Sequence, residues 1–176
     1  MRRSRSAAEE HFRSLYADHY DQVVRFVRRR TDPATADDVV AETFLVAWRR
    51  LDDVPSRAGE VLPWLYGVAR HCLLNATRGD TRQRALAVRV ASVAPRHDPA
   101  HAASVEDRLD MVQAWQRLTP EEQEVLALSA WEDLTSPYAG KVLGISAAAY
   151  RVRLSRARRA LARHLDHSPS SQETLA

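Results

Sequence analysis

Residues 136–163 read SPYAGKVLGISAAAYRVRLSRARRALAR, and their pattern predicts a helix-turn-helix motif. A short helix over 137–143 begins after Ser136, where Pro137 suits the first helical turn. A turn at Gly144-Ile145 follows, and Ser146 caps a longer helix over 147–164. Apolar residues recur in this longer helix at positions 150, 154, 157 and 161. This spacing predicts one buried stripe along the helix.

The opposite face of the longer helix is basic. Residues 146–165 hold six arginines and no acidic residue. A helix that is anchored on one side and carries hydrogen-bond donors on the other suits insertion into a DNA major groove. Two of the arginines lie at the flanks, where they can reach phosphates. The candidate DNA-contacting residues are Arg151, Val152, Arg153, Ser155, Arg156, Arg158 and Arg159. A solvated basic helix without a DNA target is the alternative.

The composition favours helices and excludes several kinds of protein. The chain has 176 residues and a formal net charge of +3, and 25 of its 26 cationic residues are arginine. Abundant alanine, arginine and leucine with only five glycines favour an all-α fold of two small helical domains. The single cysteine, Cys72, excludes an internal disulfide and a cysteine-rich zinc site.

Other classes lack their sequence signals. No apolar run approaches the roughly 18 residues of a membrane span, and no apolar signal core follows the basic N-terminus. We therefore expect a cytoplasmic, nucleoid-associated protein with no membrane contact of its own. No phosphate-binding glycine loop, nucleophile elbow or carboxylate pair indicates an enzyme. His97 and His101 have no third ligand nearby, so we expect neither a metal nor a cofactor.

Three amphipathic helices are expected in a first domain over residues 7–84. The first covers about 7–30. The second runs to Leu51, with Pro33 in the turn before it and Thr35 or Asp37 as its cap. The third begins near Leu62 and ends near Gly79. Their apolar stripes can close one small core.

A second helical domain is expected over residues 105–165. Residues 85–104 contain two prolines and many small residues without a sustained stripe, which is typical of a flexible linker. The next helix has its apolar stripe at Val105, Leu109, Val112 and Trp115. Thr119-Pro120-Glu121-Glu122 then forms a capping box. The polar residues 166–176 are expected to form a disordered tail.

The expected helix over 37–49 combines acidic and apolar residues. Its stripe at positions 40, 44, 47 and 51 should face the core, which leaves a face suited to docking on basic helices of another protein. The alternative is a plain amphipathic helix with solvated charges. The candidate docking residues are Asp38, Val39, Glu42, Thr43, Leu45, Val46 and Arg49.

Residues 61–84 mix aromatic residues, an amide and arginines. Aromatic rings can stack on unpaired bases while arginines neutralise phosphates, so this segment is a candidate for binding single-stranded DNA. Core packing is the alternative, and we favour it for Trp64.

Four motifs occur in order along the chain: DVVAETF with AWR (38–49), PWLYGVAR (63–70), LTPEEQEVL (118–126), and LGIS with RVRLSRAR (143–158). Together they resemble bacterial RNA polymerase sigma factors of the extracytoplasmic-function (ECF) group of the sigma-70 family. The resemblance covers about residues 8–165. It implies that regions two and four form two helical domains.

The resemblance implies a function and a set of partners. Region two would bind the clamp helices of the largest polymerase subunit through the 37–49 helix. It would open and read the promoter −10 element with the 54–62 loop and the 64–82 helix. Region four would bind the −35 element through the 147–163 helix and contact the polymerase flap. An anti-sigma factor is a further candidate partner. The implied −10 residues are Ser56, Arg57, His71, Asn75, Arg78 and Arg82.

The sequence departs from the family pattern at several positions. Ala41 replaces a frequent Gln, and His71 and Asn75 replace a usual Asn and Asp. Gly140 is expected to loosen its helix by up to about 1 kcal/mol relative to Ala. Tyr150 replaces a small β-branched residue and requires a repacked core.

Two other functions remain open at this point. One is an independent helix-turn-helix regulator that binds a palindromic operator without polymerase. The other is a helical adaptor whose arginine-rich helix binds DNA without sequence preference.

Overall fold

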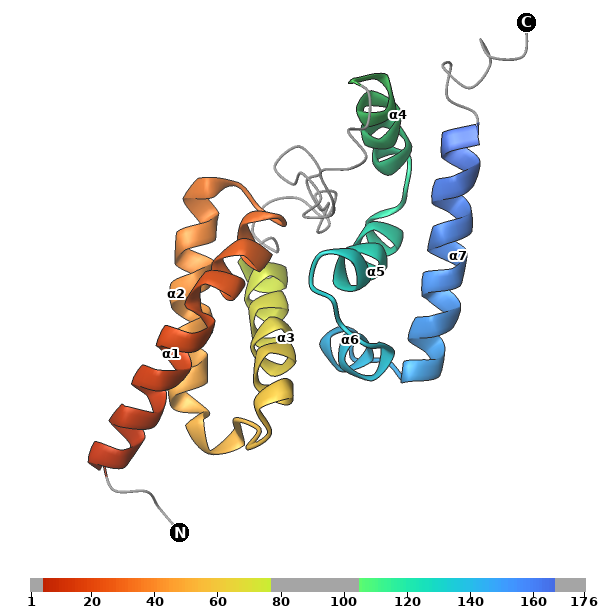
Figure 1. Ribbon diagram of the computed structural model, residues 1–176. Coiled ribbons are helices and arrows are strands. Elements are labelled where there is room, and N and C mark those ends of the chain that lie inside the picture. Colours follow the sequence, from red (N-terminus) through yellow and green to blue (C-terminus); the bar gives the residue numbers. More distant parts are fainter. Residues whose placement is uncertain (1–4, 77–104, 167–176) are drawn as a thin grey trace, which may run out of the picture.

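The computed structural model describes residues 5–76 and 105–166, and the chain is helical without strands in those ranges (Figure 1). The first domain contains α1 (Arg5–Arg28), α2 (Pro33–Arg49), a 3-10 turn (Leu51–Asp53) and α3 (Ala58–Ala76). The second contains α4 (Val105–Gln116), α5 (Pro120–Ala130), α6 (Ser136–Leu143) and α7 (Ala147–Asp166). The predicted all-α fold of two helical domains is confirmed.

Some predictions fall where the structure describes nothing. The expected linker over 85–104, with His97 and His101, lies outside the described residues. The same holds for the tail beyond Asp166 and for Arg78 and Arg82.

The helices α1, α2 and α3 pack pairwise around one core. Val23, Phe26 and Val27 of α1 are fully buried, as expected from their helical spacing. The core of α2 includes Phe44 and Ala47. Because α2 contacts both other helices of this domain, its buried surface is wide.

The beginning of α2 differs from the prediction. Asp32 is the N-cap, and its carboxylate accepts from the backbone nitrogen of Thr35 at 3.0 Å and the Thr35 hydroxyl at 2.8 Å. These bonds lower the pKa of Asp32. Pro33 is the first helical residue, so it lies in the helix and not in a turn. Thr35 and Asp37 were wrong as caps because proline at the first position already fixes the start one residue after Asp32.

The beginning of α3 also differs. The helix starts at Ala58, so residues 58–62 of the expected loop are helical, and Pro63 lies inside the helix. A proline there removes one intrahelical hydrogen bond. Pro63, Leu65 and Tyr66 are all buried, and this packing offsets the lost bond.

Local signals predict most of the second domain correctly. Thr119 and Glu122 form the capping box, and Pro120 is the first residue of α5. The hydroxyl of Ser146 accepts from the backbone nitrogen of Ala149 at 3.1 Å at the start of α7. Leu109 was predicted on the buried stripe of α4. This prediction was wrong, since the residue is 56% exposed.

Two glycines and a tyrosine shape the helix-turn-helix. Gly144 ends α6 in the left-handed conformation with φ of 69°, which favours glycine. A Cβ on Gly140 would lie 2.7 Å from the carbonyl oxygen of Ile145, so the close turn requires glycine there. From the sequence, Gly140 was expected only to loosen α6. In the structure, its main role is to leave room for the close turn. Tyr150 is fully buried, and its hydroxyl donates to the carbonyl oxygen of Val125 at 2.8 Å.

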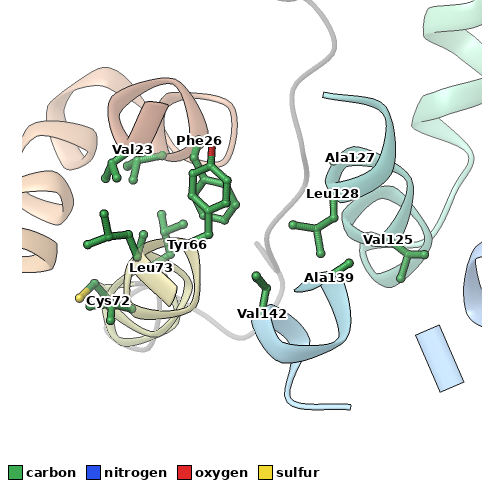
Figure 2. Close-up of a cluster of buried hydrophobic side chains, with 14 of the residues drawn as sticks. Val23, Phe26, Tyr66, Cys72, Leu73, Val125, Ala127, Leu128, Ala139 and Val142 are labelled. Atoms are coloured by element: carbon green, nitrogen blue, oxygen red, sulfur yellow. The ribbon is translucent and has the colours of Figure 1, made fainter. Parts of the chain in front are cut away.

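The two domains pack against each other through α3 and α6 (Figure 1). Phe26 and Tyr66 of the first domain stack with ring centroids 4.4 Å apart. In Figure 2 they lie opposite Leu128 of α5 and Val142 of α6, and all four residues belong to one buried cluster. The core therefore continues from one domain into the other.

Candidate functional site

The basic face of α7 is open to solvent. All seven candidate DNA-contacting residues are exposed, whereas Tyr150, Leu154, Ala157 and Ala160 are buried on the other side. Val152, 51% exposed, is an apolar residue in the middle of this face. The helix thus has the geometry that groove insertion needs. The contacts of individual residues with DNA stay predictions.

Two of these arginines make hydrogen bonds that orient them. The guanidinium of Arg158 donates to the Ser129 hydroxyl of α5 at 3.5 Å. The guanidinium of Arg159 donates to the Ser155 hydroxyl at 3.3 Å within α7. Arg158 therefore lies at the flank next to α5, where a phosphate contact is more accessible than a base edge.

A groove of about 1000 Å³ runs between α2 and α3. Asp38, Glu42 and Val46 line its α2 side, and His71 and Asn75 line its α3 side. Some of the predicted docking residues and some of the −10 residues therefore share one depression. Its α2 wall is acidic, which favours a basic protein helix and disfavours phosphate at that wall.

Two predicted docking residues are buried. Val39 is 3% exposed and Thr43 is fully buried. The Thr43 hydroxyl donates to the carbonyl oxygen of Val39 at 2.7 Å, so it is satisfied within its own helix. Both side chains are buried because α2 packs on two neighbours, although Val39 still lines the groove, and the polymerase contacts of both residues stay predictions. Leu45 and Arg49 are exposed as predicted.

The α3 side of the groove offers polar groups to a ligand. His71 is exposed, and its Nδ1 lies 2.7 Å from the carbonyl oxygen of Gly67. Because a carbonyl can only accept, Nδ1 carries the hydrogen and the Nε2 atom is left for a partner. Asn75 is exposed one turn further along. The buried Cys72 thiol lies between them, and burial raises its pKa.

The aromatic residues of α3 pack against other parts of the protein. Tyr66 is 3% exposed, and burial followed by the charge of Glu132 raises the pKa of its hydroxyl. Trp64 is partly buried against the core, and the Arg50 guanidinium lies 5.8 Å from its ring centroid. The packing role favoured for Trp64 agrees with this position.

The remaining −10 candidates lie at the other end of α3. Ser56 and Arg57 are exposed just before the helix begins. Seventeen residues separate Asn75 from the start at Ala58, so the two groups are roughly 25 Å apart along the helix. A DNA strand must run along α3 to reach both groups.

The sequence prediction missed two features. Tyr16, Tyr20 and Trp48 form a partly exposed aromatic surface on α1 and α2.

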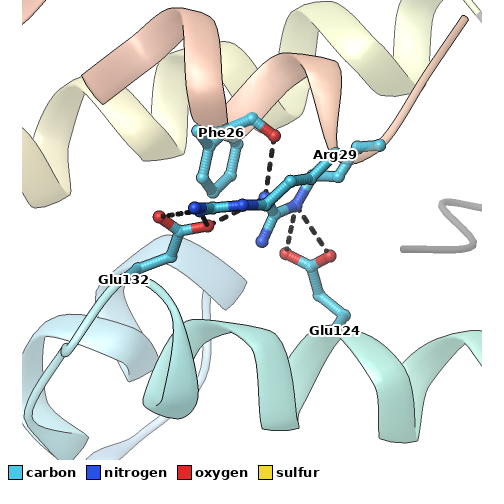
Figure 3. Close-up of polar contacts among 5 residues, drawn as sticks. Phe26, Arg29, Glu124 and Glu132 are labelled. Atoms are coloured by element: carbon cyan, nitrogen blue, oxygen red, sulfur yellow. Dashed lines mark hydrogen bonds and ion pairs between the residues drawn. The ribbon is translucent and has the colours of Figure 1, made fainter. Parts of the chain in front are cut away.

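Arg29 and Arg30 pair with Glu124 and Glu132 across the two domains (Figure 3). Arg30 lies four residues after Phe26 on the buried stripe, and this spacing was the available signal.

Comparison with known proteins identifies the family. The family described as Sigma-70 region 2 matches residues 15–83, and Sigma-70, region 4 matches residues 108–161. The ECF RNA polymerase sigma factor SigL of Mycobacterium tuberculosis (strain H37Rv) is 30% identical over 151 residues, which cover 85% of each chain. The chain belongs to the ECF group of the sigma-70 family. This sigma factor is a non-enzymatic, promoter-directing initiation factor whose partners are core RNA polymerase and promoter DNA.

Further comparisons agree with the family and the fold. SigC of Mycobacterium tuberculosis (strain CDC 1551) is 32% identical over 164 residues, covering 89% of this sigma factor and 85% of SigC. CnrH, solved in complex with the cytosolic domain of CnrY, gives a TM-score of 0.60 at 27% identity, covering 88% and 87% of the two chains. RpoE from Bartonella quintana, solved with the anti-sigma factor NepR, gives a TM-score of 0.63 at 23% identity, covering 89% and 98%.

Because the chain belongs to this family, the two alternative functions, an independent regulator and a nonspecific adaptor, are set aside. Within the described residues, no helix is long and apolar enough to cross a membrane.

Proposed function

We propose that the two domains divide promoter recognition between them. Residues 105–165 bind the duplex −35 element, and residues 7–84 bind the polymerase and capture the opened −10 element. The exposed basic face of α7 carries this proposal, because it is the surface with arginine donors on one side and a full packing anchor on the other. Arg151, Val152, Ser155 and Arg156 reach base edges, whereas Arg153, Arg158 and Arg159 contact phosphates.

The α2 side of the groove is proposed to bind the clamp helices of the largest polymerase subunit. Asp38 and Glu42 are exposed and neither makes an ion pair among the described residues, so their carboxylates are available to a basic partner helix. Val46, Leu45 and Arg49 complete the surface. Val39 and Thr43 are buried and support this surface from the core side of α2. The polymerase flap contacts the second domain.

The α3 side is proposed to bind the non-paired strand of the −10 element. His71 and Asn75 offer hydrogen-bonding groups at one end, and Ser56 and Arg57 at the other. Arg78 and Arg82 belong to the same predicted set. The acidic α2 wall keeps phosphates on the α3 side of the groove.

The proposal places the protein in the cytoplasm, on the nucleoid, without a cofactor. It also includes an anti-sigma partner, because a protein of the same fold is solved with one. A binding assay with candidate anti-sigma proteins tests that partner. Absence of any complex that blocks polymerase binding would remove it from the proposal.

Reconstitution tests the main proposal. The purified protein is added to sigma-free bacterial core polymerase on fragmented genomic DNA, and the transcripts are sequenced. We expect defined 5′ ends that share upstream elements at −10 and −35 spacing. The matched control is Arg151→Ala with Arg156→Ala, which should abolish selection of the −35 element while core binding persists. Transcripts with no shared upstream element would reject the assignment.

A further inference from the structure

Val152 is an exposed apolar side chain in the middle of a basic helix face. It is 51% exposed, and the other candidate DNA-contacting residues of α7 are arginines and one serine. Every other valine whose side chain the structure describes is buried or half-buried. Single exposed apolar residues are common on protein surfaces, so the surroundings of Val152 decide whether it has a partner.

An uncharged row runs through Val152 along the centre of the exposed face of α7. Ala148 lies one turn before Val152 and Ser155 one turn after it, and both are exposed. By helical spacing, these three residues face away from the buried Tyr150 and Leu154. Ser155 follows Ala148 by seven residues, so the row is about 10 Å long, which matches about three base-pair steps of DNA.

Arginines flank the uncharged row on both sides. Helical spacing places Arg151 and Arg158 along one side of the row and Arg156 along the other. Among the described residues, neither Arg151 nor Arg156 has a hydrogen bond or an ion pair, so both guanidinium groups are available to a ligand. A duplex that reaches both arginines brings its base edges onto the row between them.

The base edges in the major groove offer a single kind of apolar group. All four bases present polar donors or acceptors there, and thymine adds a C5 methyl group. A valine pressed against a polar edge removes water from it without replacing the hydrogen bond, which is unfavourable. A valine against the methyl group buries apolar surface on both partners. Because valine is β-branched, its χ1 angle is nearly fixed in a helix, and the contact costs little side-chain entropy.

We propose that Val152 selects a thymine in the −35 element by packing against its C5 methyl group. The inference rests on the proposed binding of α7 to the −35 element and names the base that one position of the helix selects. The side chains of Ala148 and Ser155 are shorter than that of Val152, so they let the helix approach until the valine touches the methyl group. The flanking arginines hold the duplex at this depth through polar contacts.

Deoxyuridine tests this contact, because it differs from thymidine only in lacking the C5 methyl group. The −35 element is first read from the transcripts of the reconstitution experiment. Each thymine of the element, on either strand, is then replaced singly, and fluorescence anisotropy gives the affinity of the holoenzyme for each promoter. The holoenzyme carries the unmodified chain or Val152→Ala, which places a strong helix former at an exposed position. The matched control is Arg153→Ala, which changes the neighbouring residue and keeps Val152.

We expect one thymine at which deoxyuridine weakens binding of the unmodified protein roughly three- to fivefold, the effect of one buried methyl group. At that position Val152→Ala should bind both promoters with nearly equal affinity, and Arg153→Ala should keep the full ratio. Ratios that Val152→Ala leaves unchanged at every thymine would overturn the contact, as would a −35 element without an A·T pair.

A promoter with a scrambled −35 element separates the two proposals. If the holoenzyme binds it as tightly as the intact promoter, the proposed role of α7 fails, and the thymine contact fails with it. If the holoenzyme prefers the intact element but no thymine depends on Val152, only the thymine contact is rejected.

Discussion

The helices α7 and α2 show how packing determines which residues reach a partner. α7 packs with one side on α4, α5 and α6, and its whole basic face is exposed. α2 packs on both α1 and α3, and six residues of its 17 are buried. A helix covered on one side keeps a broad binding face, whereas a helix covered on two sides keeps a narrow strip.

The strip on α2 alternates binding and supporting residues within one turn. Glu42 is exposed beside the groove, and the next residue, Thr43, is fully buried. On α7 the corresponding alternation places Arg153 outside and Leu154 inside. On both helices a single position therefore separates a residue proposed to bind a partner from one that supports the fold, and α2 has fewer exposed positions to offer.

The largest expected effect is the contrast between these two neighbours of α2. Thr43→Arg places a charge in the core and should lower the free energy of unfolding by about 3 kcal/mol or more. Asp38→Arg with Glu42→Arg should leave stability within about 0.5 kcal/mol and weaken polymerase binding at least about tenfold. Thermal unfolding by circular dichroism and anisotropy with core polymerase measure the two effects. Unchanged polymerase affinity of the charge-reversed protein would discard the docking surface.

The next effect concerns the open face of α7. Arg156→Ala should cost about 1–3 kcal/mol on a promoter with a matched −35 element, because a bidentate base contact is lost. The flanking Arg153→Ala should weaken binding equally on all −35 sequences. Affinities of the holoenzyme for a set of promoters with altered −35 elements measure both. An equal loss for Arg156→Ala on every sequence would make that residue a phosphate contact.

Much of the fold follows from local signals. The capping box at Thr119, the cap at Ser146 and the left-handed Gly144 each depend on residues within one helical turn. The exposed face of α7 follows from one apolar stripe, because only one side of that helix is covered. These features were predicted correctly for that reason.

The remaining features depend on distant parts of the chain. Arg30 and Glu124 are 94 residues apart, and no local pattern pairs them. The burial of Val39 and Thr43 requires knowing that two helices cover α2. Pro63 inside α3 contradicts its local preference and is tolerated because neighbouring side chains are buried. Tertiary packing decides each of these positions.

Substitutions of two glycines, one in each domain, test the close turn of the second domain against the open groove of the first. Gly140→Ala should destabilise by about 1–3 kcal/mol, because its Cβ would lie 2.7 Å from the Ile145 carbonyl oxygen. Gly67→Ala meets no atom within 4 Å and should stabilise α3 by up to about 1 kcal/mol. Chemical denaturation measures both. Stabilisation by both substitutions would mean that the turn can relax around a methyl group.

The smallest effect concerns the anchored side of α7. Tyr150→Phe removes the hydrogen bond to the Val125 carbonyl oxygen and should cost about 1 kcal/mol. Burial also raises the pKa of Tyr150 to about 12 from 10.0, so the folded protein resists ionisation of this hydroxyl. Its contribution to stability is therefore complete below pH 10 and is lost as the pH rises toward 12. Melting temperatures between pH 9 and 12 should fall more steeply for the unmodified protein than for Tyr150→Phe. Parallel curves would show that folding does not raise the pKa of Tyr150. Equal melting temperatures of the two proteins near pH 9 would show that Tyr150 anchors α7 by packing alone, as a helix covered on one side can be held without a polar contact.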